Sequence, residues 1–71
     1  MKEYAAVFEK TLNGWSAYAP DLPGLGVAGA TFAETEQLLR EGIEIHIEGL
    51  REDGLPVPEP CTQVMRLAIP A

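Results

Sequence analysis

Residues 20–31 read PDLPGLGVAGAT, and this stretch decides the fold. Its two prolines and three glycines exclude a helix interior and make a poor central strand. Gly24 and Gly26 can adopt positive φ at little cost, which suits a sharp turn. Thr31 and Glu34 then form a capping box, in which each side chain can bond the backbone amide of the other. The sequence therefore predicts a rigid turn that leads directly into a capped helix.

Three strands are predicted around this turn. Apolar residues alternate along a first strand at about 3–9, and Asn13-Gly14 is a strong hairpin signal before a returning strand at about 15–19. A third short strand is predicted at about 25–28. Because the connections are short, the three strands should be antiparallel neighbours.

The helix is predicted over about 32–53, where Gly54 can supply the residue that ends it. A proline then occupies every second position from Pro56 to Pro60, which favours an extended connector. Residues 62–69 alternate again and are predicted to form a fourth strand. One face of that strand would carry Met65, Leu67 and Ile69, and the other Val64, Arg66 and Ala68.

The order β-β-β-α-β predicts a single α+β domain over residues 1–71. Its two layers would be one long helix and an antiparallel-rich sheet. The connector and helix are long enough for a crossover that places the last strand beside an earlier one. The opposite face of the sheet would stay exposed unless something covers it.

Composition limits the class of protein. A chain of 71 residues barely supplies a sufficient core, so self-association as a dimer or tetramer is expected. One cysteine, Cys61, excludes an internal disulfide and suits a reducing cytoplasm. The N-terminus has no apolar signal region and no run is long enough to span a membrane, so no membrane role is expected.

The net charge of −6 is unfavourable for binding a phosphate backbone, so direct nucleic-acid binding is not expected. Basic proteins are the natural partners of such a surface. The alternative is that the acidity only keeps a small protein soluble.

The predicted helix has three kinds of face. One apolar face, centred on Leu39, would cover the sheet. Leu38 and Ile45 extend this arc beyond what the sheet needs, which predicts an oligomer interface, unless they simply widen the sheet contact. The acidic ridge lies opposite the sheet and would bind a basic partner or be merely solvated; its members are Glu41, Glu44, Glu48 and Glu52.

Catalytic constellations are missing from the sequence. His46 lies on the apolar helix face without a second histidine or cysteine nearby, and Ser16 lacks the surroundings of a catalytic serine. The strand-region carboxylates are too dispersed for a two-metal nuclease, since Glu3 and Glu9 would be about 20 Å apart. We expect no enzyme activity, no cofactor and no metal; a nuclease using Asp21 is the least favoured alternative.

An ordered set of features resembles the HicB-like antitoxin domain, a family with a partial ribonuclease-H-like fold. The set comprises Tyr4 in an opening strand, Asn13-Gly14-Trp15, the loop from Pro20 to Gly24, Gly29-x-Thr31 before the helix, and Gly54-Leu55-Pro56-x-Pro58. Leu25 and Ala30 depart from the residues common in the family. Many members also carry a C-terminal DNA-binding segment. Residues 1–71 contain no such segment, so a solitary form without autorepression is expected.

This resemblance implies a non-enzymatic protein that binds and neutralises a small basic HicA-like toxin that cleaves mRNA. The partner-binding residues would be Asp21, Leu22, Glu41, Glu44 and Glu48, with Leu38 and Ile45 in the oligomer interface. The alternative is a stand-alone oligomeric binding module with no toxin partner.

Overall fold

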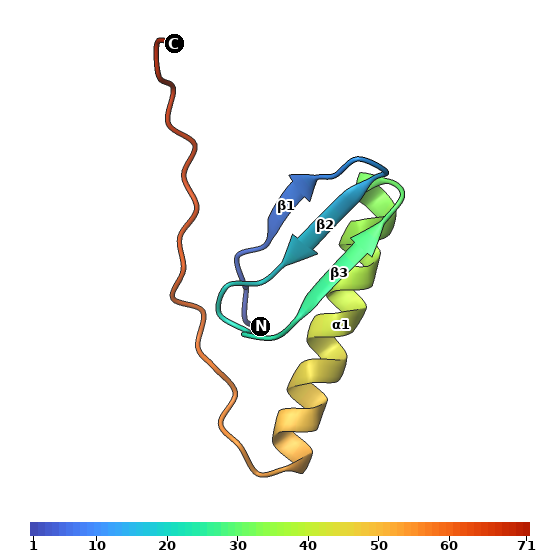
Figure 1. The fold of residues 1–71 in the computed structure, drawn as a ribbon. Helices are drawn as coiled ribbons and strands as arrows, with labels where there is room; N and C mark the ends of the chain where they lie inside the picture. The colour runs from blue at the N-terminus through green and yellow to red at the C-terminus, as the bar shows by residue number, and fades with distance from the viewer.

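Three short strands, one long helix and an extended C-terminal segment make up the protein in a computed structural model that describes residues 1–71 (Figure 1). The elements are β1 Val7–Lys10, β2 Trp15–Tyr18, β3 Gly26–Gly29 and α1 Phe32–Glu52. The strands pair in the order β1-β2-β3, both pairs antiparallel, so β1 and β3 are the two edges of the sheet. The predicted α+β class, with three strands followed by one helix, is confirmed.

The β1–β2 hairpin is closed by a hydrogen bond from the Thr11 amide to the Gly14 carbonyl, at 2.9 Å. Gly14 is buried, and a Cβ at this position would clash with the carbonyl oxygen of Gly29. Glycine is therefore required here by the close approach of the hairpin to the end of β3. Positive φ is not the reason, because Gly24 and Gly54 are the residues that adopt it.

Both ends of α1 are specified locally. At the start, the Glu34 amide donates to the Thr31 hydroxyl at 3.1 Å, so this half of the predicted capping box forms. At the end, Gly54 has φ of 69°. Its amide donates to the Arg51 carbonyl at 3.1 Å, while the Leu55 amide donates to the Leu50 carbonyl at 2.9 Å. This pair of bonds is a Schellman motif, which satisfies carbonyls that the helix end would otherwise leave open.

The core lies between α1 and the sheet, and it is small. Its buried apolar side chains are Ala17, Ala19, Leu22 and Leu39. At the start of α1, Phe32 stacks on Phe8 with ring centroids 4.3 Å apart and meets the edge of Trp15 at 5.2 Å. The helix packs mainly on β2 and β3. The helix-facing side of β1 is therefore less covered than that of its neighbours.

The C-terminal part of the chain corrects the sequence-based prediction. Residues 62–69 form no strand and make no backbone–backbone hydrogen bond. We call residues 63–71 the tail. Figure 1 shows the tail extended and standing apart from the sheet, on the β1 side. Alternation correctly indicated an extended conformation, but a strand also needs a neighbouring strand, which periodicity does not identify.

The first strand also differs from its predicted bounds. It begins at Val7 because residues 1–6, although extended in the sequence pattern, lie outside the ladder with β2. These residues instead meet the segment after the helix. The Tyr4 hydroxyl donates to the Pro58 carbonyl at 2.6 Å, and the Lys2 ammonium pairs with Glu59 at 2.6 Å.

Candidate functional site

Asp21 fastens the base of the tail to the loop between β2 and β3. One carboxylate oxygen, Oδ2, accepts the backbone amides of Cys61 and Thr62 at 3.0 and 3.1 Å. The other, Oδ1, accepts the Thr62 hydroxyl at 2.7 Å and the Cys61 thiol at 3.2 Å. We call these four hydrogen bonds the Asp21 latch. Asp21 was predicted to contact a partner, but the structure engages both of its oxygens within the chain.

The Asp21 latch shifts the pKa values of Asp21 and Cys61 in opposite directions. Hydrogen bonds from the Thr62 hydroxyl, then from the Cys61 and Thr62 amides, hold the pKa of Asp21 well below its ordinary value. The same carboxylate accepts the thiol proton and repels a thiolate, so it raises the pKa of Cys61. Cys61 is exposed, yet its environment favours the unreactive thiol.

Leu22, also predicted to contact a partner, is a core residue. Its side chain is 0% exposed, and its backbone is held by a hydrogen bond from its amide to the Ala19 carbonyl at 3.0 Å. A side chain without exposed surface cannot touch another protein in this conformation. We therefore remove Leu22 from the candidate contact residues; it anchors the loop that positions Asp21.

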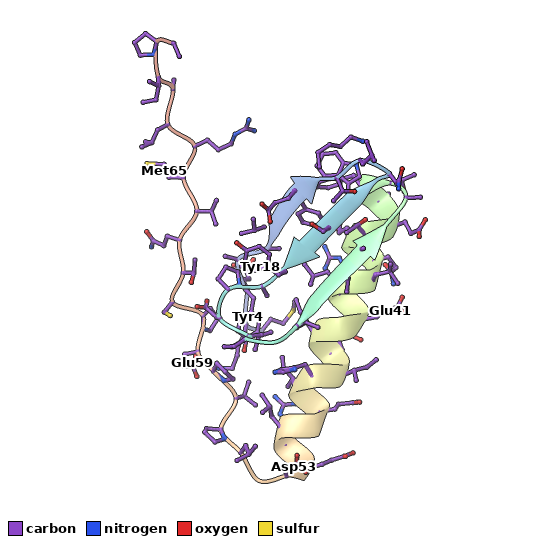
Figure 2. All side chains as sticks on the ribbon, in the orientation of Figure 1. Tyr4, Tyr18, Glu41, Asp53, Glu59 and Met65 are labelled. Carbon is purple, nitrogen blue, oxygen red and sulfur yellow. The ribbon has the colours of Figure 1, made fainter.

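The acidic ridge is exposed along α1. Glu41, Glu44 and Glu48 are all exposed, and none of them forms a salt bridge. The Glu41 carboxylate accepts one hydrogen bond, from the side-chain amide Nε2 of Gln37 at 2.9 Å. Figure 2 shows Glu41 on α1, on the other side of the sheet from the tail. These carboxylates are free to meet a cationic surface.

The two predicted oligomer residues, Leu38 and Ile45, are exposed on α1 and lie beside Glu41 of the acidic ridge, three and four residues away. Leu38 is 38% exposed and Ile45 is 69% exposed. Their spacing of seven residues places them on one side of α1, near the flank where Gly42 approaches Leu25 and Val27. The structure thus leaves this apolar flank uncovered without showing what covers it.

An open groove of about 1130 Å³ runs between α1 and the β1 side of the sheet, and the sequence did not predict it. The strand side contributes Tyr4, Ala6 and Phe8, at every second position. The helix side contributes the apolar residues Leu39, Ile43 and Ile47 and a charged rim that includes Glu44 and Glu48. The groove lies where the helix leaves β1 uncovered.

No donor cluster for a metal is present, since no group of three or more His, Cys, Asp or Glu side chains comes together. His46 is half-buried on α1 and makes no side-chain hydrogen bond with other protein groups. No helix of the structure is both long enough and apolar enough to span a membrane.

Comparison with known proteins places this fold in a family. Residues 4–69 match the HicB-like antitoxin of the bacterial toxin–antitoxin system. A UPF0150 protein of Synechocystis sp. is 39% identical over 67 residues, covering 93% of this chain and 85% of that protein. An uncharacterised 14.9 kDa protein of Haemophilus phage HP1 is 38% identical over 56 residues, covering 79% of this chain. The chain spans 42% of the length of the phage protein. No solved structure matches the chain significantly. With nearly every residue inside the match, the chain belongs to the HicB-like antitoxin family of bacterial toxin–antitoxin systems.

Proposed function

We propose that this chain is a non-enzymatic antitoxin that neutralises a small basic, mRNA-cleaving toxin of the HicA type by binding it in the cytoplasm. Membership of an antitoxin family supports a role in a toxin–antitoxin system. The observation that carries the binding mode is the row of unpaired carboxylates along α1, at Glu41, Glu44 and Glu48.

Charge complementarity is the physical basis of this proposal. A protein that grips RNA needs a basic surface to neutralise phosphates, and an acidic protein can occupy that surface in place of RNA. The chain carries eleven acidic against five basic residues, and the acidic ridge concentrates some of that charge on a rigid helix. Complementary charges speed association and fix orientation, and their effect declines as salt rises.

The test is co-purification with the product of an adjacent gene that encodes a basic protein of similar size. The double variant Glu41→Lys/Glu44→Lys should weaken the complex by roughly tenfold or more at low salt, since each reversal turns an attraction into a repulsion. The matched control is Glu3→Lys/Glu9→Lys, which changes the net charge equally with exposed residues of the N-terminal strand region.

Retained binding by the control together with loss by the helix variant supports the proposed surface. Equal weakening of both variants would mean that net charge alone drives association, and would remove the acidic ridge from the proposal. Absence of binding by the unmodified chain at low salt would defeat the antitoxin function itself.

A stand-alone oligomeric module is the second candidate. The exposed Leu38 and Ile45 favour it, because uncovered apolar flanks suit contact with another copy. The Synechocystis relative also extends little beyond the length matched by this chain. Absence of a binding partner, combined with stable self-association, is the outcome that selects this candidate.

A further inference from the structure

The tail exposes large apolar side chains that a chain of this size rarely leaves in water. Val64, Met65, Leu67 and Ile69 are 62%, 79%, 72% and 71% exposed. No residue after Leu55 makes a backbone–backbone hydrogen bond. Figure 2 shows Met65 on the tail, apart from both the sheet and the helix. The tail therefore has an extended backbone with no strand hydrogen-bonded to it, and apolar side chains that no other part of the chain covers.

The groove offers the complementary features. Tyr4, Ala6 and Phe8 line it at every second position, which is the period at which Met65, Leu67 and Ile69 recur along the tail. The seven residues 63–69 span about 23 Å when extended, and the seven residues 4–10 of β1 and its lead-in span the same length. The apolar side of the tail thus matches the groove in both period and length.

The edge of the sheet supplies the backbone partners. β1 pairs with β2 on one side and with nothing on the other, so half of its amides and carbonyls face outward. An extended segment can satisfy such an edge by adding to it as a further strand. Seating Met65, Leu67 and Ile69 toward the helix would place Arg66, the one charged side chain of the tail, on the opposite face and out of the apolar groove.

We propose that residues 63–69 of one copy add as a fourth strand to the free edge of β1 in a second copy, with Met65, Leu67 and Ile69 seated in that copy's groove. The exchange is reciprocal, so each copy gives its tail and receives the other. This inference concerns the chain alone and does not depend on the proposed toxin.

The Asp21 latch is the reason for choosing a second copy as the occupant. It fixes Cys61 and Thr62 against the β2–β3 loop, and from there the tail leads away from its own β1. Charge also favours the exchange. The tail carries one basic and no acidic side chain, whereas all eleven acidic residues lie in residues 1–62, the part of the second copy that receives the tail. Exchange of an identical element creates a closed dimer from contacts that each copy already offers.

The first experiment measures the mass of the chain in solution by analytical ultracentrifugation at low to high micromolar concentration. The 7.7 kDa chain should sediment as a dimer. Leu67→Asp, which places a charge on the seated side, should weaken the dimer by roughly a hundredfold or more, because two leucines are lost from apolar sites. Val64→Asp is the matched control on the opposite side of the tail and should leave the dimer largely intact.

Folding does not confuse this comparison, because both side chains are exposed in a single copy and circular dichroism checks the helix. A monomer at high micromolar concentration overturns the proposal. Equal effects of the two variants also overturn it, as does an unchanged dimer after truncation behind Thr62, since either result places the interface elsewhere, for example on Leu38 and Ile45.

The second experiment locates the tail. In a mixture of isotope-labelled and unlabelled copies, isotope-filtered NMR should show contacts between the Met65 methyl of one copy and Ala6 or Ile43 of the other. The same contacts within one copy would show the tail folded onto its own β1, and would overturn the exchange. If the chain is a monomer and a basic protein occupies the groove, the groove belongs to that partner and the proposal is equally refuted.

Discussion

Leu22→Ala separates a core role for this loop residue from a role in partner contact. The side chain is 0% exposed in the β2–β3 loop, beside Asp21. Truncation removes its buried methyl groups and leaves a cavity that the surrounding structure fills only in part. For a fully buried leucine this costs about 2–5 kcal/mol of folding free energy.

That cost is large for a chain with so small a core. In a domain of this size, 1 kcal/mol shifts the melting temperature by about 4–8 °C, so the variant should melt roughly 10 °C or more below the unmodified chain. Urea unfolding followed by circular dichroism at 222 nm measures the change. All samples are compared at one protein concentration, because self-association would make the apparent stability depend on it.

Leu12→Ala is the matched control, since it makes the same chemical change at a side chain that is 98% exposed. Its expected effect lies within about 0.5 kcal/mol of zero. If Leu22→Ala also changes the free energy of unfolding by no more than about 0.5 kcal/mol and instead abolishes partner binding, Leu22 is a contact residue and the expected core role is wrong.

The contacts of β3, the helix and the Asp21 latch each lead to a further prediction. Gly29→Ala should lower the free energy of unfolding in urea by about 1–3 kcal/mol, because the added Cβ would lie 2.6 Å from the Thr35 hydroxyl oxygen. Gly49→Ala is the contrasting variant: its Cβ would meet nothing within 4 Å, so the better helix former should stabilise α1 by up to about 1 kcal/mol. Because the folded-state pKa of Asp21 is depressed, the latch should contribute full stability above about pH 4 and lose it as the pH falls further; Asp21→Asn should remove this part of the acid sensitivity of unfolding. The raised pKa of Cys61 should slow its alkylation by iodoacetamide at neutral pH, and Asp21→Asn should accelerate it.

Local chemistry made much of the fold predictable. The Thr31 cap and the Gly54 helix end each depend on residues within one turn of the helix, so the sequence indicates them directly. The Asn13-Gly14 dipeptide marked the hairpin for a reason that the sequence could not show. Gly14 is needed for its approach to Gly29, a contact between segments fifteen residues apart.

Long-range relations account for what was missed. The four hydrogen bonds to Asp21 join the β2–β3 loop to a segment some forty residues later, and nothing in the local pattern encodes that pairing. The complete burial of Leu22 is likewise not visible in its local sequence. The alternation of residues 62–69 identified a segment able to form a strand but not its partner. The alternating prolines after α1 were the available signal that this segment would leave the helix extended.

A titration of RNA cleavage tests most directly the proposal that this chain acts by covering a basic toxin. A basic HicA-type protein encoded by an adjacent gene is the proposed partner; it is mixed with increasing amounts of the chain at low salt, and cleavage of a labelled mRNA is followed. We predict complete inhibition at a stoichiometric ratio, with inhibition weakening as salt is raised. Cleavage that continues unchanged at a large excess of the chain would contradict the account.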